Sequence, residues 1–352
     1  MLSVLKRPFF WIGVATSVGA LALAVRGLEI DEVLDALAGA NFAWLIPAAA
    51  ILLVGLYFRA LRWGALFYPT RGLSTGKLFG AMNVGYMLNN LLPLRVGEFG
   101  RAFVIGETES IGKVTALTTV VVERIVDVIF VFALLLILLP FVDEPGWATG
   151  PALVLGIATI SLAIALAAAG RARLAVLRLA DWALRFAPRA LRSRLRAAIE
   201  SALNGFAVLG DPRTLARVLG LSVIAWGCSS LYTYCVLLMF DLPLTYAAPV
   251  LIMVALAMGM VIPSSAGYIG VHHAIAIEVL TTVFGVARAD AAGFAFVSHA
   301  LFFLIPTLLG IAYLWTQRGL WERLLSSISY RGDVPRVEPD APQDAVKADG
   351  GR

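Results

Sequence analysis

The sequence predicts an all-α protein, a polytopic bundle of transmembrane helices. Of its 352 residues 60% are hydrophobic and 14% are charged, with a mean hydropathy of +0.86. Soluble domains carry roughly 25% charged residues. Several apolar runs also approach the ~20 residues that a helix needs to cross a bilayer. We therefore expect one transmembrane domain over residues 1–330, followed by a polar, disordered cytoplasmic tail at 331–352.

Six runs are apolar enough to be full spans, namely 8–25, 42–58, 117–140, 151–170, 217–240 and 291–315. Two more apolar segments, 76–92 and 246–286, are interrupted by Pro, Gly and Asn, which predicts broken or re-entrant hairpins. If these segments cross completely, the bundle has eight spans. The first run follows Lys6 and Arg7 as a signal peptide would, but it is long enough to span, and we interpret it as an uncleaved helix.

The charges of the loops orient the spans, because short cytoplasmic loops are rich in Lys and Arg. Both termini are expected in the cytoplasm, as is a loop that contains Arg59, Arg62, Arg71 and Lys77. The acidic loops 27–40 and 141–149 are expected outside. This pattern requires 76–112 to enter and leave on the cytoplasmic face. The segment 246–286 begins and ends outside, either as two full spans or as a hairpin.

The segment 171–210 is basic and amphipathic, and we do not expect it to span. Eight arginines lie between 171 and 196. Of these, Arg192, Arg194 and Arg196 lie on other faces than an apolar stripe of Leu191, Leu195, Ile199, Leu203 and Phe206. Such a helix lies in the plane of the membrane interface. Anionic lipid headgroups are a better partner for it than nucleic acid.

A cluster of polar residues interrupts the apolar sequence between residues 89 and 127. Its members are Asn89, Asn90, Arg95, Glu98, Arg101, Glu123, Arg124 and Asp127. A charge within a span costs at least ~2.5 kcal/mol, so such residues face the protein interior and often mark a site. Glu98, Glu123 and Asp127 balance Arg95, Arg101 and Arg124, and Glu98 and Arg101 have the spacing of a helical ion pair.

Two interpretations of this cluster remain open. The charges can form a closed ion-pair network that pins the first hairpin to the helix at 117–140. Alternatively they line a polar cavity for a charged headgroup, since arginine binds phosphate oxygens bidentately.

The only three histidines of the chain, His272, His273 and His299, lie in apolar surroundings. If 246–286 is re-entrant they come close together, whereas two full crossings would separate them. Packing, a substrate or proton role and metal binding are the alternatives. We expect no metal, because no His-Glu-x-x-His spacing is present, and no cofactor. Cys228 and Cys235 lie about 10 Å apart on a helix, too far for a disulfide.

A short internal repeat links the two interrupted segments. Pro93-x3-Gly97-x2-Gly100 matches Pro263-x3-Gly267-x2-Gly270. Three matched positions in a glycine-rich chain can also arise by chance. A genuine repeat would be typical of secondary transporters, in which broken helices meet near the midplane.

The chain resembles a known family at these residues. Asn89-Asn-Leu-Leu-Pro-Leu-Arg-Val-Gly-Glu98, Arg101 and Val122-Glu-Arg-Ile-Val-Asp127 resemble the transmembrane domain of lysylphosphatidylglycerol synthases and their flippase-like relatives. Ile262-Pro-Ser-Ser-Ala-Gly-Tyr-Ile-Gly-Val-His-His273 and Gly285-Val fit the second half, so the resemblance covers roughly 10–317. Many members carry Glu after the second Gly-Val, where this chain has His272-His273. The synthase and glycosyltransferase activities of some relatives are not implied, because we find no such domain.

The resemblance implies lipid translocation as the leading role. We therefore expect a multi-pass protein of the bacterial plasma (inner) membrane that recognises a phospholipid or other lipid-linked phosphate headgroup. Its partners would be anionic or zwitterionic lipids, with no nucleic acid, and a homo-oligomer is left open. An intramembrane enzyme acting on a lipid-linked substrate and a membrane scaffold are the alternatives. No catalytic residue is assigned, and the predicted binding residues are the polar cluster and the three histidines.

Overall fold

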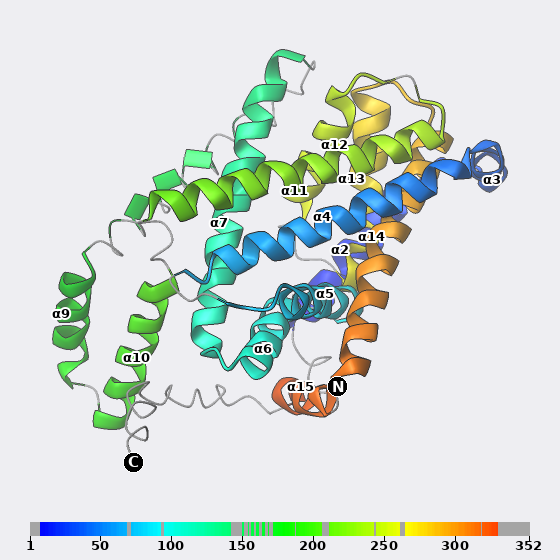
Figure 1. Ribbon diagram of the computed structural model, residues 1–352. Coiled ribbons are helices and arrows are strands. Elements are labelled where there is room, and N and C mark those ends of the chain that lie inside the picture. The colour runs from blue at the N-terminus through cyan, green and yellow to red at the C-terminus, as the bar shows by residue number, and fades with distance from the viewer. Residues whose placement is uncertain are drawn as a thin grey trace.

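The computed structural model describes residues 8–68, 72–92, 95–141, 172–186, 188–205, 211–242, 244–260, 265–317 and 319–329, with isolated positions between 150 and 168. All regular structure in these residues is helical (Figure 1). The first half contains α2 (Pro8–Val25), α3 (Ile30–Gly39), η1 (Phe42–Trp44), α4 (Leu45–Ala65), α5 (Thr75–Leu91), α6 (Gly97–Glu109), α7 (Lys113–Leu138) and η2 (Leu139–Phe141). The second half contains α9 (Arg173–Ala183), η3 (Leu184–Phe186), α10 (Arg189–Gly205), α11 (Pro212–Met239), α12 (Ala247–Gly259), η5 (Ala266–Tyr268), α13 (Val271–Thr282), α14 (Arg288–Thr316) and α15 (Leu320–Ser329).

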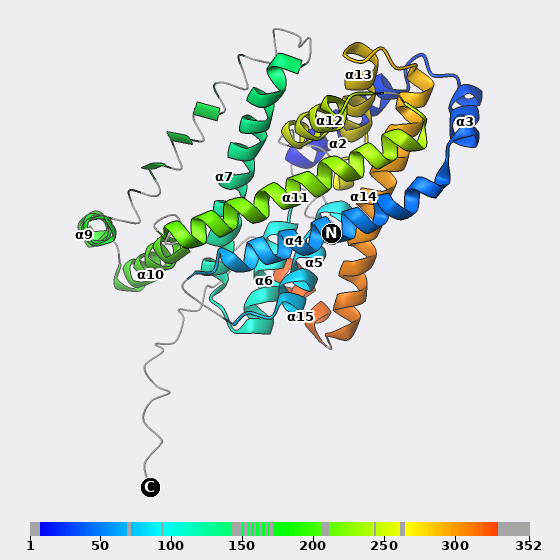
Figure 2. The same ribbon diagram turned by 45° about the horizontal axis from the view of Figure 1, so that its top comes forward.

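Three helical segments among the described residues have the length and apolar composition of membrane spans: Phe42–Ala65, Pro212–Met239 and Arg288–Thr316. A fourth span is possible if the pair Gly13–Val25 and Ile30–Gly39, bent by 77°, forms one. Helices α4 and α11 run side by side for much of their length, and α14 packs against α5 (Figures 1 and 2). The protein is therefore an all-α membrane bundle, as predicted.

Both interrupted segments fold back on themselves. Helix α5 packs against α6, and α12 packs against α13. Helices α6, α12 and α13 have 13, 13 and 12 residues, so each is about 20 Å long or shorter, against a hydrocarbon core of about 30 Å. These lengths favour hairpins over full crossings. Pro93 and Pro263, which we expected at the breaks, lie outside the described residues.

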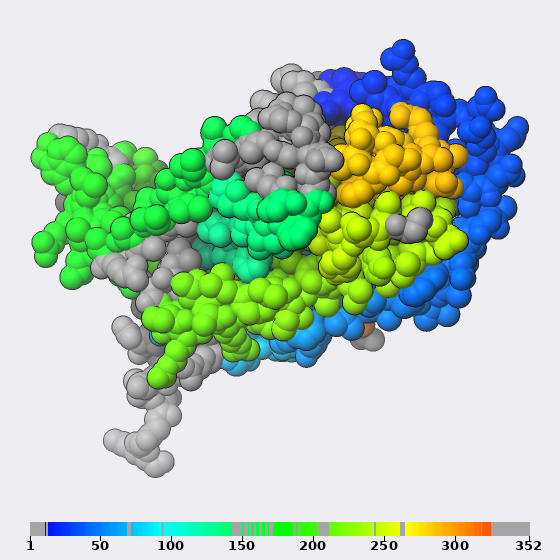
Figure 3. All heavy atoms as spheres, turned by 90° about the horizontal axis from the view of Figure 1, so that it is seen from above, coloured from blue at the N-terminus to red at the C-terminus, as the bar shows by residue number. Residues whose placement is uncertain are grey.

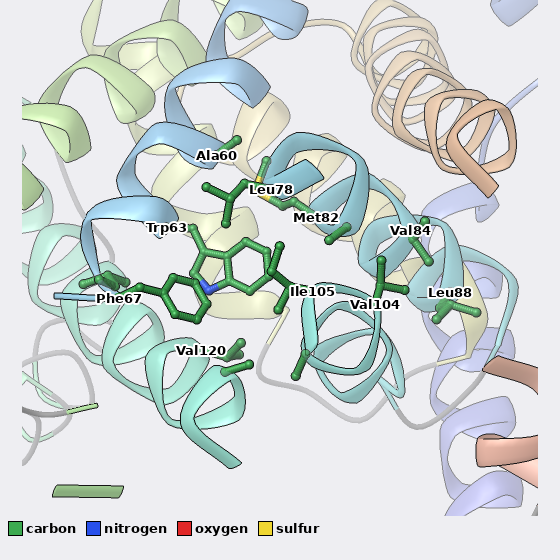
Figure 4. Packing of buried hydrophobic residues seen from close by; sticks show 14 of the residues in the cluster. Ala60, Trp63, Phe67, Leu78, Met82, Val84, Leu88, Val104, Ile105 and Val120 are labelled. Carbon is green, nitrogen blue, oxygen red and sulfur yellow. The ribbon is translucent and has the colours of Figure 1, made fainter. Parts of the chain in front are cut away.

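A tightly packed core joins α4, α5, α6 and α7. Figure 4 shows the fully buried Trp63 between these helices, near Leu78, Ile105 and Val120. The Trp63 indole donates a hydrogen bond to Thr119 Oγ1 at 3.0 Å. Between α5 and α6 the backbones touch, because a Cβ added at Gly97 would collide with the Gly85 carbonyl oxygen. Small residues permit such close helix approach in membranes.

The structure corrects three expectations about element boundaries. Residues 30–39, predicted as a loop, form helix α3. Helix α4 continues to Ala65, beyond the predicted end at residue 58, and so includes Arg59 and Arg62, which we had placed in a cytoplasmic loop. Helix α11 begins at Pro212, earlier than expected, where the Asp211 side chain accepts a hydrogen bond from the Thr214 N–H.

The basic segment consists of two helices, α9 and α10, with Pro188 between them. Figure 3 shows this region projecting from the bundle. Arg173 pairs with Glu200 at 2.7 Å and Arg196 with Asp181 at 3.1 Å, which ties the two helices together. In the predicted stripe Leu203 is buried, whereas Leu191 and Leu195 are exposed. Phe206, the tail 331–352 and most of the expected span 151–170 lie outside the described residues.

Candidate functional site

Arg62 is the centre of the charged cluster. Its side chain is fully buried on α4, and its two terminal nitrogens reach Glu123 Oε1 at 2.8 Å and Asp127 Oδ1 at 2.6 Å. Because Glu123 and Asp127 lie four residues apart, they share one face of α7 and one guanidinium can bridge them. Arg62 Nη1 also donates to Ser222 Oγ at 3.3 Å, so the cluster joins α4, α7 and α11.

Arg62 was not among the predicted site residues. The positive-inside rule assigned it to a loop, although an apolar helical pattern of Leu56, Ala60, Trp63 and Phe67 continues past it. Adding Arg62 changes the predicted balance of charge. Four arginines (Arg62, Arg95, Arg101 and Arg124) now face three carboxylates (Glu98, Glu123 and Asp127), an excess of one positive charge.

The inner half of the cluster is a closed ion-pair network. Arg101 Nη1 lies 2.8 Å from Glu123 Oε2, and its guanidinium stacks over the Trp63 ring, 5.0 Å from the centroid. The expected pair of Glu98 with Arg101 is not formed, since Arg101 turns to Glu123 instead. Arg62, Arg101, Glu123 and Asp127 are all buried. This half pins the first hairpin to α7, as the structural interpretation requires.

The outer half of the cluster is open. Arg124 lies 3.3 Å from Glu123 and 3.4 Å from Asp127, yet its side chain is 47% exposed. Arg95 is exposed, and among the described residues no carboxylate lies within the 4.0 Å of an ion pair to it. Glu98 Oε2 is buried and has no hydrogen-bond partner in the described part of the chain. Arg95, Glu98 and Arg124 are all near enough to Tyr268 to interact electrostatically with its hydroxyl.

The two asparagines brace the first hairpin. Asn89 Oδ1 accepts a hydrogen bond from the Gly97 N–H at 2.7 Å, which links the end of α5 to the start of α6. Asn90 Nδ2 donates to Thr307 Oγ1 at 3.0 Å and to the Phe303 carbonyl at 3.1 Å on α14. These hydrogen bonds position the backbone around Arg95.

The breaks of the two hairpins meet. The Arg95 guanidinium lies over the Tyr268 ring, 5.4 Å from the centroid. Gly267, with a φ of +70°, packs against Phe303 and the Asn90 carbonyl oxygen. Gly100 and Gly270 also lie where a side chain would collide, with Leu88 and with the Ser17 backbone respectively. The four glycines of the sequence repeat therefore occupy tightly packed positions in the two hairpins.

The three histidines form one cluster. The ring centroid of His299 lies 4.9 Å from that of His272 and 4.7 Å from that of His273. All three side chains are buried. This arrangement corresponds to the re-entrant alternative, because two full crossings of 246–286 would have separated them.

The described residues contain no group of three His, Cys, Asp or Glu placed to hold a metal ion. Two surface hollows lie away from the charged cluster. One, of about 460 Å³, is apolar and lies between α7 and α12, where it is lined by residues that include Leu134, Ile137, Tyr246 and Val250. The other, of about 340 Å³, lies beside Asp181, Arg192, Ser193 and Arg196. Cys228 and Cys235 are free thiols.

The fold and the buried charges define a multi-pass integral membrane protein. The family model for the lysylphosphatidylglycerol synthase TM region matches residues 10–310. The chain therefore belongs to this family, through its transmembrane part, and the predicted resemblance is confirmed. No curated protein matches the chain. Membership makes it a lipid-related membrane protein.

Proposed function

We propose that this protein moves a lipid with a phosphate-bearing headgroup between the leaflets of the plasma membrane, and that the headgroup binds at Arg95, Glu98 and Arg124. One observation carries the proposal. Arg95 and Arg124 keep exposed guanidinium groups beside a buried Glu98 oxygen that has no partner among the described residues. Because an unpaired buried polar group is destabilising, a ligand that satisfies Glu98 gives this capacity a function.

The closed network keeps the binding groups available. Arg62 and Arg101 neutralise most of the charge of Glu123 and Asp127, so Arg124 is held by long contacts of 3.3 and 3.4 Å rather than fully engaged. Two planar guanidinium groups suit the oxygens of a phosphate. Glu98 can accept a hydrogen bond from an amino or hydroxyl group of the same headgroup. The two guanidinium groups and the Glu98 carboxylate together favour a zwitterionic or amino-bearing phospholipid.

The position of the site also supports transport. Arg95 lies at the break of the first hairpin and touches the break of the second. In secondary transporters, substrates bind where the broken helices of two repeats meet. Access from either side would then require only that the two breaks separate.

A scaffold role is the second candidate, favoured by the closed pairs of Arg62 with Glu123 and Asp127. A scaffold role explains the ion pairs of the inner half of the cluster but does not explain the exposed arginines of the outer half. The two functions predict different effects of changes at Arg95, which lies outside the ion-pair network.

Translocation of fluorescent phosphatidylglycerol and phosphatidylethanolamine in reconstituted vesicles tests the proposal. Arg95→Gln and Glu98→Gln should lower the translocation rate at least about tenfold, as loss of one charged hydrogen bond implies, with an unchanged midpoint of thermal unfolding. Arg213→Gln, at an exposed arginine of α11, is the matched control and should leave both unchanged. Wild-type vesicles that move no lipid faster than empty vesicles would refute the proposal. Unchanged rates in both site variants would favour the scaffold.

A further inference from the structure

The histidine cluster lies in surroundings without a counter-charge. Helices α2 and α12, which pack against α13, contain no ionisable residue in their described ranges. On α13 and α14 the other charged residues, Glu278, Arg288 and Asp290, lie at least five residues from the nearest histidine. The nearby titratable groups are the hydroxyls of Tyr232, which donates to the Ser298 carbonyl, and of Tyr268, beside Arg95, Glu98 and Arg124.

The hydrogen bonds fix the protonation of one nitrogen on each ring. The Gly270 N–H donates to His273 Nδ1 at 3.3 Å, so that nitrogen carries no proton. His299 Nε2 lies 2.7 Å from the Gly267 carbonyl oxygen, which can only accept, so this nitrogen is protonated. His272 Nε2 lies 3.2 Å from Ser298 Oγ, which itself donates to the Ala295 carbonyl, so His272 Nε2 donates. Three neutral imidazoles satisfy every one of these contacts.

A proton added to His273 breaks one of these contacts. On His273 Nδ1 it would face the Gly270 N–H, donor against donor. His272 and His273 lie in the first turn of α13, where a positive charge opposes the helix dipole. A charge on one ring also repels a second charge on rings less than 6 Å away.

The groups that these histidines hold belong to the break of the second hairpin. Gly267 O and Gly270 N flank Tyr268 in the chain, and the Arg95 guanidinium lies over the Tyr268 ring. We infer that the three histidines form a proton-binding latch. When they are neutral, they hold the break of the second hairpin in place, and proton uptake releases Tyr268 from Arg95. The closed state then binds fewer protons than the open state, so lowering the pH favours the open state. Proton uptake thereby controls the separation of the two breaks in the proposed transporter. This role rests on the proposed function, whereas the latch itself does not.

Spin-label distances measure the latch directly, without any lipid substrate. With Cys228 and Cys235 replaced by Ser and Ala, labels are attached through Leu91→Cys and Ile269→Cys, two exposed positions beside the breaks. The distance should lengthen by several ångströms between about pH 8 and about pH 5, the range in which histidine changes its charge. Glu278→Gln, an exposed change on α13, is the control and should preserve the lengthening.

The variant His272→Gln/His273→Gln/His299→Gln should show no pH-dependent lengthening. Because the chain has only these three histidines, imidazole NMR signals of the wild-type protein report this site alone. They should titrate at the same midpoint as the distance change, which keeps the test valid if the triple variant does not fold.

A wild-type distance that is the same at both pH values, or imidazoles that titrate without any distance change, would overturn the latch. Lipid movement with no pH-dependent opening would refute the latch and leave the transporter standing, and the reverse result would refute the transporter alone.

Discussion

Arg95 and Tyr268 stack on each other although both have left-handed backbones, with φ values of +51° and +59°. Residues other than glycine rarely adopt this conformation, and it is least common for bulky side chains. Backbone strain of about 1–3 kcal/mol per residue persists only where the surroundings enforce it, and it concentrates at switches and binding sites. Here the enforcing groups are Asn89 and Asn90 on one side and the histidines on the other.

Replacing Tyr268 with glycine should change function more than stability. The substitution relieves about 1–2 kcal/mol of left-handed strain but loses a cation–π contact of roughly 0.5–1 kcal/mol and adds flexibility to the unfolded chain. The free energy of unfolding should therefore change by less than about 1 kcal/mol. Arg95 loses its contact with the second break, so the two breaks separate more readily, and lipid translocation should become faster at neutral pH and lose its pH dependence. Tyr268→Phe retains the ring and serves as the control in the vesicle assay.

Removing Arg62 should destabilise the fold strongly. Arg62→Met leaves Glu123 with the two remaining arginines and Asp127 with Arg124 alone, and breaking a buried ion pair typically costs about 3–5 kcal/mol. Thermal unfolding of the purified protein in detergent measures the effect. The double variant Arg62→Met/Asp127→Leu should recover part of the loss, because it also removes the carboxylate that has lost its shorter, buried ion pair. Equal stability of Arg62→Met and wild type would show that the network is not closed.

The hairpin α5–α6 should not tolerate a methyl group at its contact point. In Gly97→Ala the new Cβ collides with the Gly85 carbonyl and the Asn89 side chain, so the two helices must separate. Overpacking of this kind costs about 1–3 kcal/mol. Gly220→Ala on α11 meets nothing within 4 Å and should be neutral or stabilising by up to about 1 kcal/mol. Similar unfolding midpoints for the two variants would contradict the packing described for α5 and α6.

Asn90 should couple the first hairpin to α14. Asn90→Ala removes two hydrogen bonds, each worth about 0.5–1.5 kcal/mol, and leaves Thr307 bonded only to its own helix. We expect a loss of stability of about 1–3 kcal/mol together with slower lipid translocation, since the break that carries Arg95 loosens. Thr307→Val should reproduce about half of the loss of stability. A fully stable Asn90→Ala variant would rule out this bracing role.

Sequence reasoning succeeded where local chemistry decides the structure. The bounds of α2 match the predicted run 8–25, and Pro, Gly and Asn correctly indicated the two broken segments. The prediction failed where a partner distant in sequence decides the position of a side chain. Arg62 is buried only because Glu123 and Asp127, some 60 residues later, neutralise it. The positive-inside rule takes no account of such a distant partner. In the same way, the partner of Arg101 proved to be Glu123 on α7 rather than the nearer Glu98.

The bridging of two carboxylates by Arg62 has a consequence for biogenesis. Helix α4 leaves the ribosome well before α7, so the translocon must handle this guanidinium while its acidic partners are still unmade. An unpaired arginine at the centre of a helix adds about 2.5–3.5 kcal/mol to the free energy of insertion, and the cost is smaller for Arg62, which lies in the last turn of α4. Nascent chains that stop before Lys113 should therefore integrate α4 less completely than chains extended past Leu138, as glycosylation mapping of truncated chains would reveal. Equal integration of the two sets of chains would show that Arg62 reaches the membrane interface until its partners on α7 are made.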